Sequence, residues 1–569
     1  MKSRITYLAA LLALAMLAGA CGSSDFSDAE TSSSEADGLQ PAESGGAESA
    51  DDETTNEGQT IAADEAMGED SVAQSAGEPA DASGAARAST TTAPQGEPAA
   101  DAASDGGFFA AAPEEESDAE SEANTFQDYG VRPFVSTGVD PLSTFALDVD
   151  TASYSIGRQW LNSGAVPPPE SVRVEEYLNS FDYDYVAPRD GLNVQADGGP
   201  SPYDPDNVIV RIGVQAEQVA NADRPSASLT FVVDTSGSMD RADRLELVKT
   251  SLRRLTQELE SRDTVSIITY SDNAQILLAP TSVADEEQIL AAIDRLRPTG
   301  STNLEAGLQA GYDMANEAFQ LGGINRVVLA SDGVANVGLT DPDGLARLIR
   351  EDADRGIHLV TVGVGMGNFN DVVMEQSADQ GDGFYAYVND EREAEKLFSD
   401  DLVSTLLTVA IDGKIQVEFN EDAVDEYRLI GFENRAVLDD DFRNDAVDAG
   451  ELGAGHQVTA LYELKVRRGY EDADVIGTVQ LRWEDPEERS VRETRLVLTP
   501  GMIDDRWNDT DEDFRLAVTV AAFAEVLRDS PHTGDVSLVQ VGQEADALSP
   551  GSGSIQELAD MIWNSDALL

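Results

Sequence analysis

The chain is 569 residues long and strongly acidic, with 108 Asp and Glu against 37 Lys and Arg and a formal net charge of -71. This balance argues against a nucleic-acid-binding protein, because phosphate binding needs clustered Lys and Arg. It argues equally against electrostatic docking on anionic lipid. A chain of this length predicts about three or four domains, and its single cysteine, Cys21, excludes an intrachain disulfide.

The first residues have the pattern of a secretion signal. A basic start is followed by an apolar run, 8–17, that is too short to span a bilayer comfortably, and by small residues at 18–20. The pattern resembles the bacterial lipobox, in which the cysteine is diacylated and becomes the mature N-terminus, although Ala18 stands where that motif prefers Leu. The alternative is an ordinary cleaved signal peptide. We expect residues 1–21 to be a lipoprotein signal peptide and Cys21 to be the lipidation site.

This expectation places the protein outside the cytoplasm, anchored by lipid to the cell membrane, or to the outer membrane if the cell has one. Residues 22–124 then follow as a tether, with about 26 acidic residues and one basic residue, Arg87. Few large apolar residues occur here, so we predict disorder and a spacer role. Rapid proteolysis of this segment in the folded protein would test that prediction.

The next segment, 125–226, is expected to form an N-terminal extension domain. Its predicted elements are a strand at 144–149, short helices at 154–163 and 172–181, and an alternating strand at 208–215.

From 227 to 410, strands and helices alternate regularly. The predicted strands are 229–233, 264–270, 326–330, 357–364 and 384–388. The predicted helices are 245–259, 286–296, 304–319, 345–353 and 391–407. Such alternation predicts an α/β domain with a parallel-rich sheet and helices on both faces.

After 411 the pattern becomes β-rich, and 411–569 is expected to be a C-terminal domain with terminal helices. The predicted strands are 414–419, 427–431, 456–464, 473–483 and 493–498, and the predicted helices are 514–528 and 555–562. The strand at 208–215 either belongs to a separate sheet or joins these later strands. In the second case the α/β domain is an insertion into a β-rich platform.

The chemistry-bearing residues follow the apolar strand at 229–233. Asp234, Ser236 and Ser238 form an Asp-x-Ser-x-Ser loop that offers one carboxylate and two hydroxyls. These are hard oxygen ligands, suited to Mg²⁺, with Mn²⁺ or Ca²⁺ as alternatives. Ligands of an open parallel sheet sit at the carboxyl ends of its strands. The simpler interpretation is a serine-rich turn in which Asp234 is only a cap.

Two later loops complete the predicted site. Thr302 lies between two predicted helices, and Asp332 follows the strand at 326–330 in a Ser-Asp-Gly turn. Three loops that each place a small oxygen ligand at one edge of a sheet predict an octahedral metal site completed by water.

With these loops in place, residues 228–410 closely resemble the von Willebrand factor type A (VWA) family. The resemblance implies a Rossmann-like fold with a metal-ion-dependent adhesion site, where a partner's Asp or Glu often completes the metal shell. The ligands it implies, direct or through water, are Asp234, Ser236, Ser238, Thr302 and Asp332. The flanking segments look like the N- and C-terminal extensions of a bacterial subgroup of VWA lipoproteins.

Two further acidic groups have alternative interpretations. Asp148, Asp150 and Ser153 are either a second cation site or a strand end whose Asp150 or Thr151 caps the next helix. The acidic run 504–513 either binds Ca²⁺ or is a solvated helix start.

No catalytic motif is found, and the scattered histidines give no active site, so we do not expect an enzyme. The predicted function is binding of an Asp- or Glu-presenting protein, or another acidic ligand, through the metal. The alternative is a structural envelope protein whose metal only stabilises the loops.

Overall fold

The computed structural model describes residues 124–241, 243–333, 342–366, 369–486, 488–534 and 536–569. Cys21, the expected signal peptide and the expected tether up to residue 123 lie outside these ranges. Within them, no helix is both long enough and apolar enough to cross a membrane.

The inner part of the chain forms a six-stranded sheet in the order β10-β9-β8-β5-β6-β7. Its strands are β5 (Ala227–Asp234), β6 (Thr264–Tyr270), β7 (Ala274–Ser282), β8 (Ile324–Ser331), β9 (Ile357–Val364) and β10 (Tyr385–Val388). Neighbouring strands are parallel, except that β7 runs antiparallel to β6. Every residue of β5 and β8 is buried, as expected of strands between two helical layers.

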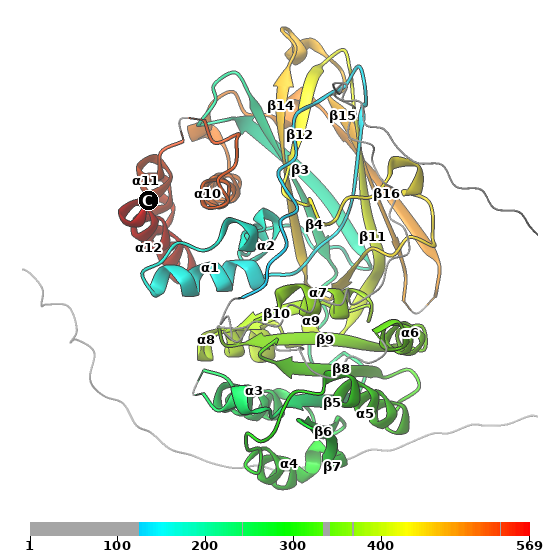
Figure 1. Ribbon diagram of the computed structural model, residues 1–569. Helices are drawn as coiled ribbons and strands as arrows, with labels where there is room; N and C mark the ends of the chain where they lie inside the picture. The colour runs from blue at the N-terminus through cyan, green and yellow to red at the C-terminus, as the bar shows by residue number, and fades with distance from the viewer. Residues whose placement is uncertain (1–123, 242, 334–341, 367–368, 487, 535) are drawn as a thin grey trace, which may run out of the picture. The chain divides into compact units, whose positions relative to one another are not determined.

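Helices lie on both sides of this sheet, as Figure 1 shows, and the predicted α/β fold is confirmed. They are α3 (Leu245–Glu258), α4 (Glu286–Ile293), α5 (Leu304–Glu317), α6 (Pro342–Ala353), α7 (Asp371–Asp379), α8 (Glu391–Glu395) and α9 (Leu402–Leu406). Helix α5 begins where the Asn303 side chain accepts the Ala306 N–H. Gly307 allows this helix to approach closely, because a Cβ there would lie 2.7 Å from the Tyr270 ring.

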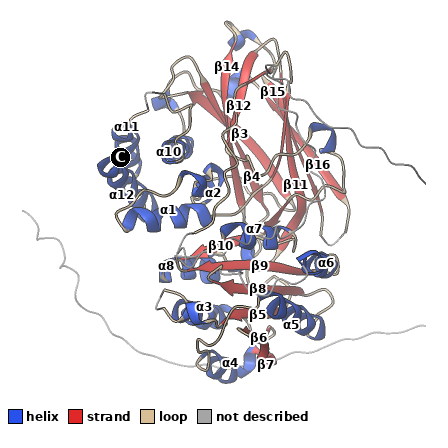
Figure 2. Cartoon of the chain, viewed as in Figure 1, coloured by secondary structure: helices blue, strands red, loops and turns tan. Residues whose placement is uncertain are grey.

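The flanking segments form two five-stranded sheets, coloured red with the inner sheet in Figure 2. The first has the order β1-β12-β14-β4-β3 and the second β13-β11-β15-β16, with β2 also paired to β11. The strands are β1 (Val135–Ser136), β2 (Leu142–Ala146), β3 (Leu192–Pro200), β4 (Val208–Ala216), β11 (Thr408–Phe419), β12 (Val424–Ile430), β13 (Gly450–Gly453), β14 (Gln457–Val466), β15 (Gly477–Glu484) and β16 (Val491–Leu498).

Side chains from both sheets share one apolar core, and a second apolar layer contains helices from both flanks of the inner domain. These helices are α1 (Ala152–Asn162), α2 (Val174–Asn179), α10 (Glu512–Leu527), α11 (Leu538–Leu548) and α12 (Gly553–Leu568). Figure 1 shows them together beside the first sheet.

The two flanks of the inner domain are joined by strand pairing. Strand β4, which precedes the inner domain, pairs antiparallel with β14, and β2 pairs with β11. The alternative in which the α/β domain is inserted into a β-rich platform is therefore confirmed. We use "platform" for the described parts of 125–226 and 411–569.

Several predicted elements differ from the structure. The single helix predicted at 391–407 is broken by a π-helical turn, Lys396–Asp400, where the Asp401 N–H bonds to the Lys396 carbonyl five residues back. The strand predicted at 144–149 ends at Ala146, because Asp148 then accepts the N–H of Asp150 in a tight turn. The pattern also missed β3, β7, β13, α7 and α11.

Candidate metal centre

Asp234 is the last residue of β5 and is fully buried. One carboxylate oxygen accepts the Ser236 N–H at 2.7 Å and the other accepts the Ser331 hydroxyl at 3.1 Å. The hydroxyl oxygens of Ser236 and Ser238 lie 2.9 Å apart. The Asp-x-Ser-x-Ser loop is therefore folded so that its three oxygen-bearing side chains lie together at the carboxyl end of a central strand.

The loop that carries Thr302 is tied to this first loop by main-chain hydrogen bonds. The Thr299 N–H donates to the Thr235 carbonyl at 2.5 Å, and the Gly237 N–H donates to the Gly300 carbonyl at 3.0 Å. Thr302 itself is buried. Within the described chain its hydroxyl makes no hydrogen bond to the other four candidate residues.

Asp332 follows β8 and is also fully buried. Its carboxylate pairs with the Arg244 guanidinium, which also donates to the Ser238 carbonyl at 3.0 Å and to the Met366 carbonyl at 2.8 Å. Burial and the neighbouring Asp332 carboxylate together raise the pKa of Asp234 to about 6.

The donor set fits a divalent cation. All five side chains offer oxygen atoms, which hard cations prefer. Asp234 accepts only from neutral groups, and no Lys, Arg or His of the described residues forms an ion pair with it. A buried carboxylate without a counter-charge is costly, and a bound Mg²⁺ would supply that charge.

Sequence reasoning missed three residues that shape this centre: Ser331, Arg244 and Asp272. Asp272, just after β6, accepts both the N–H and the hydroxyl of Ser301 at 2.9 and 2.5 Å. Gly300 has φ +71°, and a Cβ there would lie 2.8 Å from the Asp272 carboxylate. Asp272 could have been found from its position two residues after β6, the parallel neighbour of β5.

Asp148, Asp150 and Ser153 are tied into the fold by an arginine and by the main chain. The two carboxylates pair with Arg435 at 3.2 and 3.0 Å, but the same guanidinium also pairs with Glu375 and Asp379, so one cationic group serves four carboxylates. The second cation site therefore stays a prediction. The Ser153 hydroxyl donates to the Ser171 carbonyl. The capping interpretation is wrong, since Thr151 stands at the N-cap of α1 and no side chain caps the helix.

The last residues of the acidic run 504–513 form a helix start, as one of the two interpretations predicted. The Asp511 side chain accepts the Asp513 N–H at the N-cap of α10, and Glu512 and Asp513 lie in the first turn. Most of the other acidic side chains are exposed, and Asp509 pairs with Arg506. Negative charge is favourable at this end of a helix.

The three histidines lie apart in the fold. His358 is in β9 and its Nδ1 lies 2.9 Å from the Asp382 carbonyl, while His532 lies beside Phe134 in the platform. His456 precedes β14, where its Nδ1 accepts the Gly453 N–H at 3.1 Å. Burial lowers the pKa of His358 to about 3 and that of His456 to about 4.

His456 should make the protein sensitive to acid. Its ring stays neutral in the folded state, while in the unfolded chain it takes up a proton below about pH 6.5. The free energy of unfolding therefore falls as the pH drops from about 6.5 towards the folded-state pKa of about 4.

The matched variant is His456→Asn, because asparagine keeps an acceptor near the position of Nδ1 but cannot titrate. Between pH 7 and pH 5, the wild type should lose about 2 kcal/mol relative to His456→Asn in urea unfolding. Parallel pH profiles for the two proteins would contradict this.

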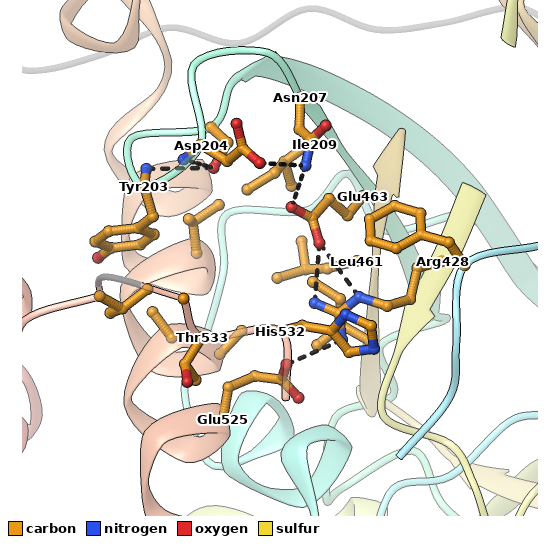
Figure 3. A pocket seen from close by; sticks show the side chains of 18 of the residues that line it. Tyr203, Asp204, Asn207, Ile209, Arg428, Leu461, Glu463, Glu525, His532 and Thr533 are labelled. Atoms are coloured by element: carbon orange, nitrogen blue, oxygen red, sulfur yellow. Dashed lines mark hydrogen bonds and ion pairs between the residues drawn. The ribbon is translucent and has the colours of Figure 1, made fainter. Parts of the chain in front are cut away.

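The platform contains a cavity of about 660 Å³ between α10 and the strands β4, β12 and β14 (Figure 3). Arg428 crosses it and pairs with Glu463 at 3.0 Å and with Glu525 at 2.9 Å. Glu525 also accepts from Ser530 and Arg528. These charged groups are therefore paired with one another within the described chain.

Three family descriptions match the sequence: "von Willebrand factor" over residues 120–211, "von Willebrand factor type A domain" over 228–400, and "Uncharacterized protein YfbK, C-terminal" over 404–567. The chain is 35% identical to YfbK of Escherichia coli K12 over 447 residues, which cover 74% of this chain and 77% of that protein.

More distant similarities have lower identity. Human inter-alpha-trypsin inhibitor heavy chain H3 is 26% identical over 208 residues, which cover 35% of this chain and 23% of that protein. Among solved structures, a von Willebrand factor type A protein from Catenulispora acidiphila is 16% identical, with a TM-score of 0.40, and the match covers 67% of this chain and 91% of that one.

Proposed function

This chain belongs to the family of the Escherichia coli protein YfbK and carries a VWA domain, and on that premise we propose that it is a binding protein of the cell envelope. In this proposal it captures a protein, or another acidic ligand, through a divalent metal at the carboxyl edge of the inner sheet. VWA domains are protein-interaction domains, and they typically bind a divalent metal at this edge.

The observation that carries the proposal is the buried Asp234 carboxylate. It is held by the Ser236 N–H and the Ser331 hydroxyl, and it lacks a cationic partner within the described chain. Arg244 balances Asp332 but does not balance Asp234. We assign the metal to Asp234, Ser236, Ser238, Thr302 and Asp332.

The chemistry of this set suits ligand capture. A bound Mg²⁺ would supply a coordination position that a partner's carboxylate can take. Asp234 and Asp332 provide only two negative charges, and Arg244 offsets one of them. The remaining ligands are neutral hydroxyls, so a bound Mg²⁺ would keep a net positive charge that can attract an acidic partner. This is binding chemistry, and we propose no catalytic role.

We further propose that Cys21 carries the lipid anchor and that the acidic segment 22–124 acts as a spacer. A single cysteine directly after an apolar run and small residues supports this assignment. Two or more acyl chains would hold the protein stably on the membrane. Mass measurement of the mature N-terminus would show whether Cys21 is acylated; an unmodified residue there would overturn the anchor.

The alternative is a structural envelope protein in which the metal only fixes the loops. The main-chain bonds between the Asp234 and Thr302 loops favour neither interpretation, because they would stabilise a binding site and a purely structural site equally.

One experiment separates the two. Full-length protein is immobilised and exposed to envelope extract with Mg²⁺, with chelator, and with chelator followed by excess Mg²⁺. Capture through the metal predicts a partner that is retained, released and regained in that order, and not retained by Asp234→Asn. The structural alternative predicts that Mg²⁺ raises the melting temperature while the captured proteins stay the same. That second outcome would overturn the proposed function.

A further inference from the structure

A second group of acidic side chains lies where the VWA domain meets the platform. Asp382 lies between α7 and β10, whereas Asp448 lies just before β13 and Glu451 lies within it. One carboxylate oxygen of each residue lies within 4.8 Å of the others. We call these three residues the junction cluster.

The junction cluster contains a buried oxygen with no partner. Glu451 is 8% exposed, and its Oε1 has no hydrogen-bond donor. Among the described residues, no Lys, Arg or His forms an ion pair with any of the three carboxylates. Burial and the neighbouring Asp412 carboxylate raise the pKa of Asp382 to about 6.

Three basic side chains influence these carboxylates, and each of them donates to another group. Arg489 pairs with Glu484 at 2.7 Å. Lys414 donates to the carbonyls of Asn444 and Val447. Arg326 donates to the Leu406 carbonyl and the Thr408 hydroxyl, although its Nη1 is also buried without a partner. A direct pairing of Arg326 with Glu451 is therefore the competing explanation for the unpaired oxygen.

The backbone holds the junction cluster in place. Asp382 has φ +46° and lies between two glycines, and a Cβ at the second, Gly383, would lie 1.6 Å from the Leu359 carbonyl oxygen. On the other side, a Cβ at Gly450 would lie 1.9 Å from the Leu147 carbonyl oxygen. The Ala449 N–H donates to Asp412 at 3.0 Å. These close contacts fix the main chain on both sides before any ligand binds.

We propose that Asp382, Asp448 and Glu451 bind one divalent cation, with Ca²⁺ as the best fit, and that it fastens the VWA domain to the platform. Carboxylates are hard ligands, and Ca²⁺ accepts irregular sets of six to eight oxygens with water filling the remainder. The exposed side of Asp448 gives water and the ion access. Asp382 precedes β10, so this site lies at the edge of the sheet opposite to Asp234.

The test uses full-length protein carrying Asp234→Asn, so that binding at the Asp234 centre does not contribute. Thermal unfolding is followed with chelator and with increasing Ca²⁺. A hundredfold excess of Ca²⁺ over its dissociation constant should raise the melting temperature by about 3 °C or more. Asp448→Asn and Glu451→Gln should each abolish this shift. Asp440→Asn, which changes another exposed carboxylate of the same segment, should keep it.

The melting temperature in chelator distinguishes a carboxylate that binds the cation from one that only stabilises the fold. In chelator, Asp448→Asn should melt at the same temperature as its parent or higher, because one of several repelling charges is gone. A lower melting temperature in chelator, or equal Ca²⁺ shifts in Asp448→Asn and Asp440→Asn, would overturn the proposal. So would the absence of a Ca²⁺ shift in the parent, which would favour the pairing of Arg326 with Glu451. None of these outcomes bears on the Asp234 centre.

Discussion

Replacing Asp234 with alanine is expected to weaken Mg²⁺ binding at least about 100-fold, since loss even of groups that only support metal ligands commonly costs 10- to 100-fold. Asp234 is the fully buried carboxylate around which the Ser236 and Ser331 hydrogen bonds are arranged. Removing it takes away a charged ligand and the acceptor that shapes the Asp-x-Ser-x-Ser loop. Isothermal titration of Mg²⁺ into the full-length protein measures the effect.

The controls address folding and unspecific binding. Asp234→Asn keeps an oxygen acceptor for the Ser236 N–H, so the loop should stay folded while affinity still falls. Asp313→Ala removes an exposed carboxylate from α5 and should leave the Mg²⁺ affinity unchanged. All variants share the acidic segment 22–124, so the difference between them isolates the centre. Saturable Mg²⁺ binding of equal strength in Asp234→Ala and Asp313→Ala would show that the metal sits elsewhere.

The second large effect is expected at Arg435, which joins three parts of the chain. Its guanidinium pairs with Asp148 and Asp150 before the VWA domain, and with Glu375 and Asp379 on α7 within it. Arg435 itself lies after the domain, and its carbonyl accepts the Ala146 N–H at 2.9 Å. Asp148 and Asp150 are almost completely buried.

Arg435→Met should therefore lower the free energy of unfolding by about 3–5 kcal/mol, because it fills similar space but leaves buried carboxylates without a counter-charge. Arg443→Met offers a matched control. Arg443 is 56% exposed and pairs with Glu493, so its loss should cost less than about 1 kcal/mol. Urea unfolding at pH 7 compares the two variants. Similar losses would mean that the Arg435 cluster contributes no more than a surface ion pair.

Local sequence patterns determined the inner fold and brought out its candidate metal centre. Continuous apolar runs predicted β5 and β8, because a strand buried on both faces leaves no room for polar alternation. Asp234 is the last residue of β5 and Asp332 directly follows β8, and parallel neighbours end at the same edge. Proximity of the two acids could therefore be inferred from chain position alone.

The same local reasoning was weak where a strand lacks a clear apolar face. Strand β7 is largely exposed and lies at the edge of its sheet, so it shows no alternation to detect. Strand β3 ends in Asp-Gly-Gly-Pro, a sequence typical of turns. Its nine-residue pairing with β4 overrides that preference.

Only the tertiary structure decided which charged groups far apart in sequence contact one another. The pairing of Arg244 with Asp332, the four carboxylates around Arg435, and the junction cluster each join segments separated by dozens to hundreds of residues. A charged residue in a sequence shows neither its burial nor its partner. The pairing of Arg244 with Asp332 depends on packing within the VWA domain, whereas the other two groups depend on how that domain packs on a platform built from the two flanks. No local periodicity encodes either packing.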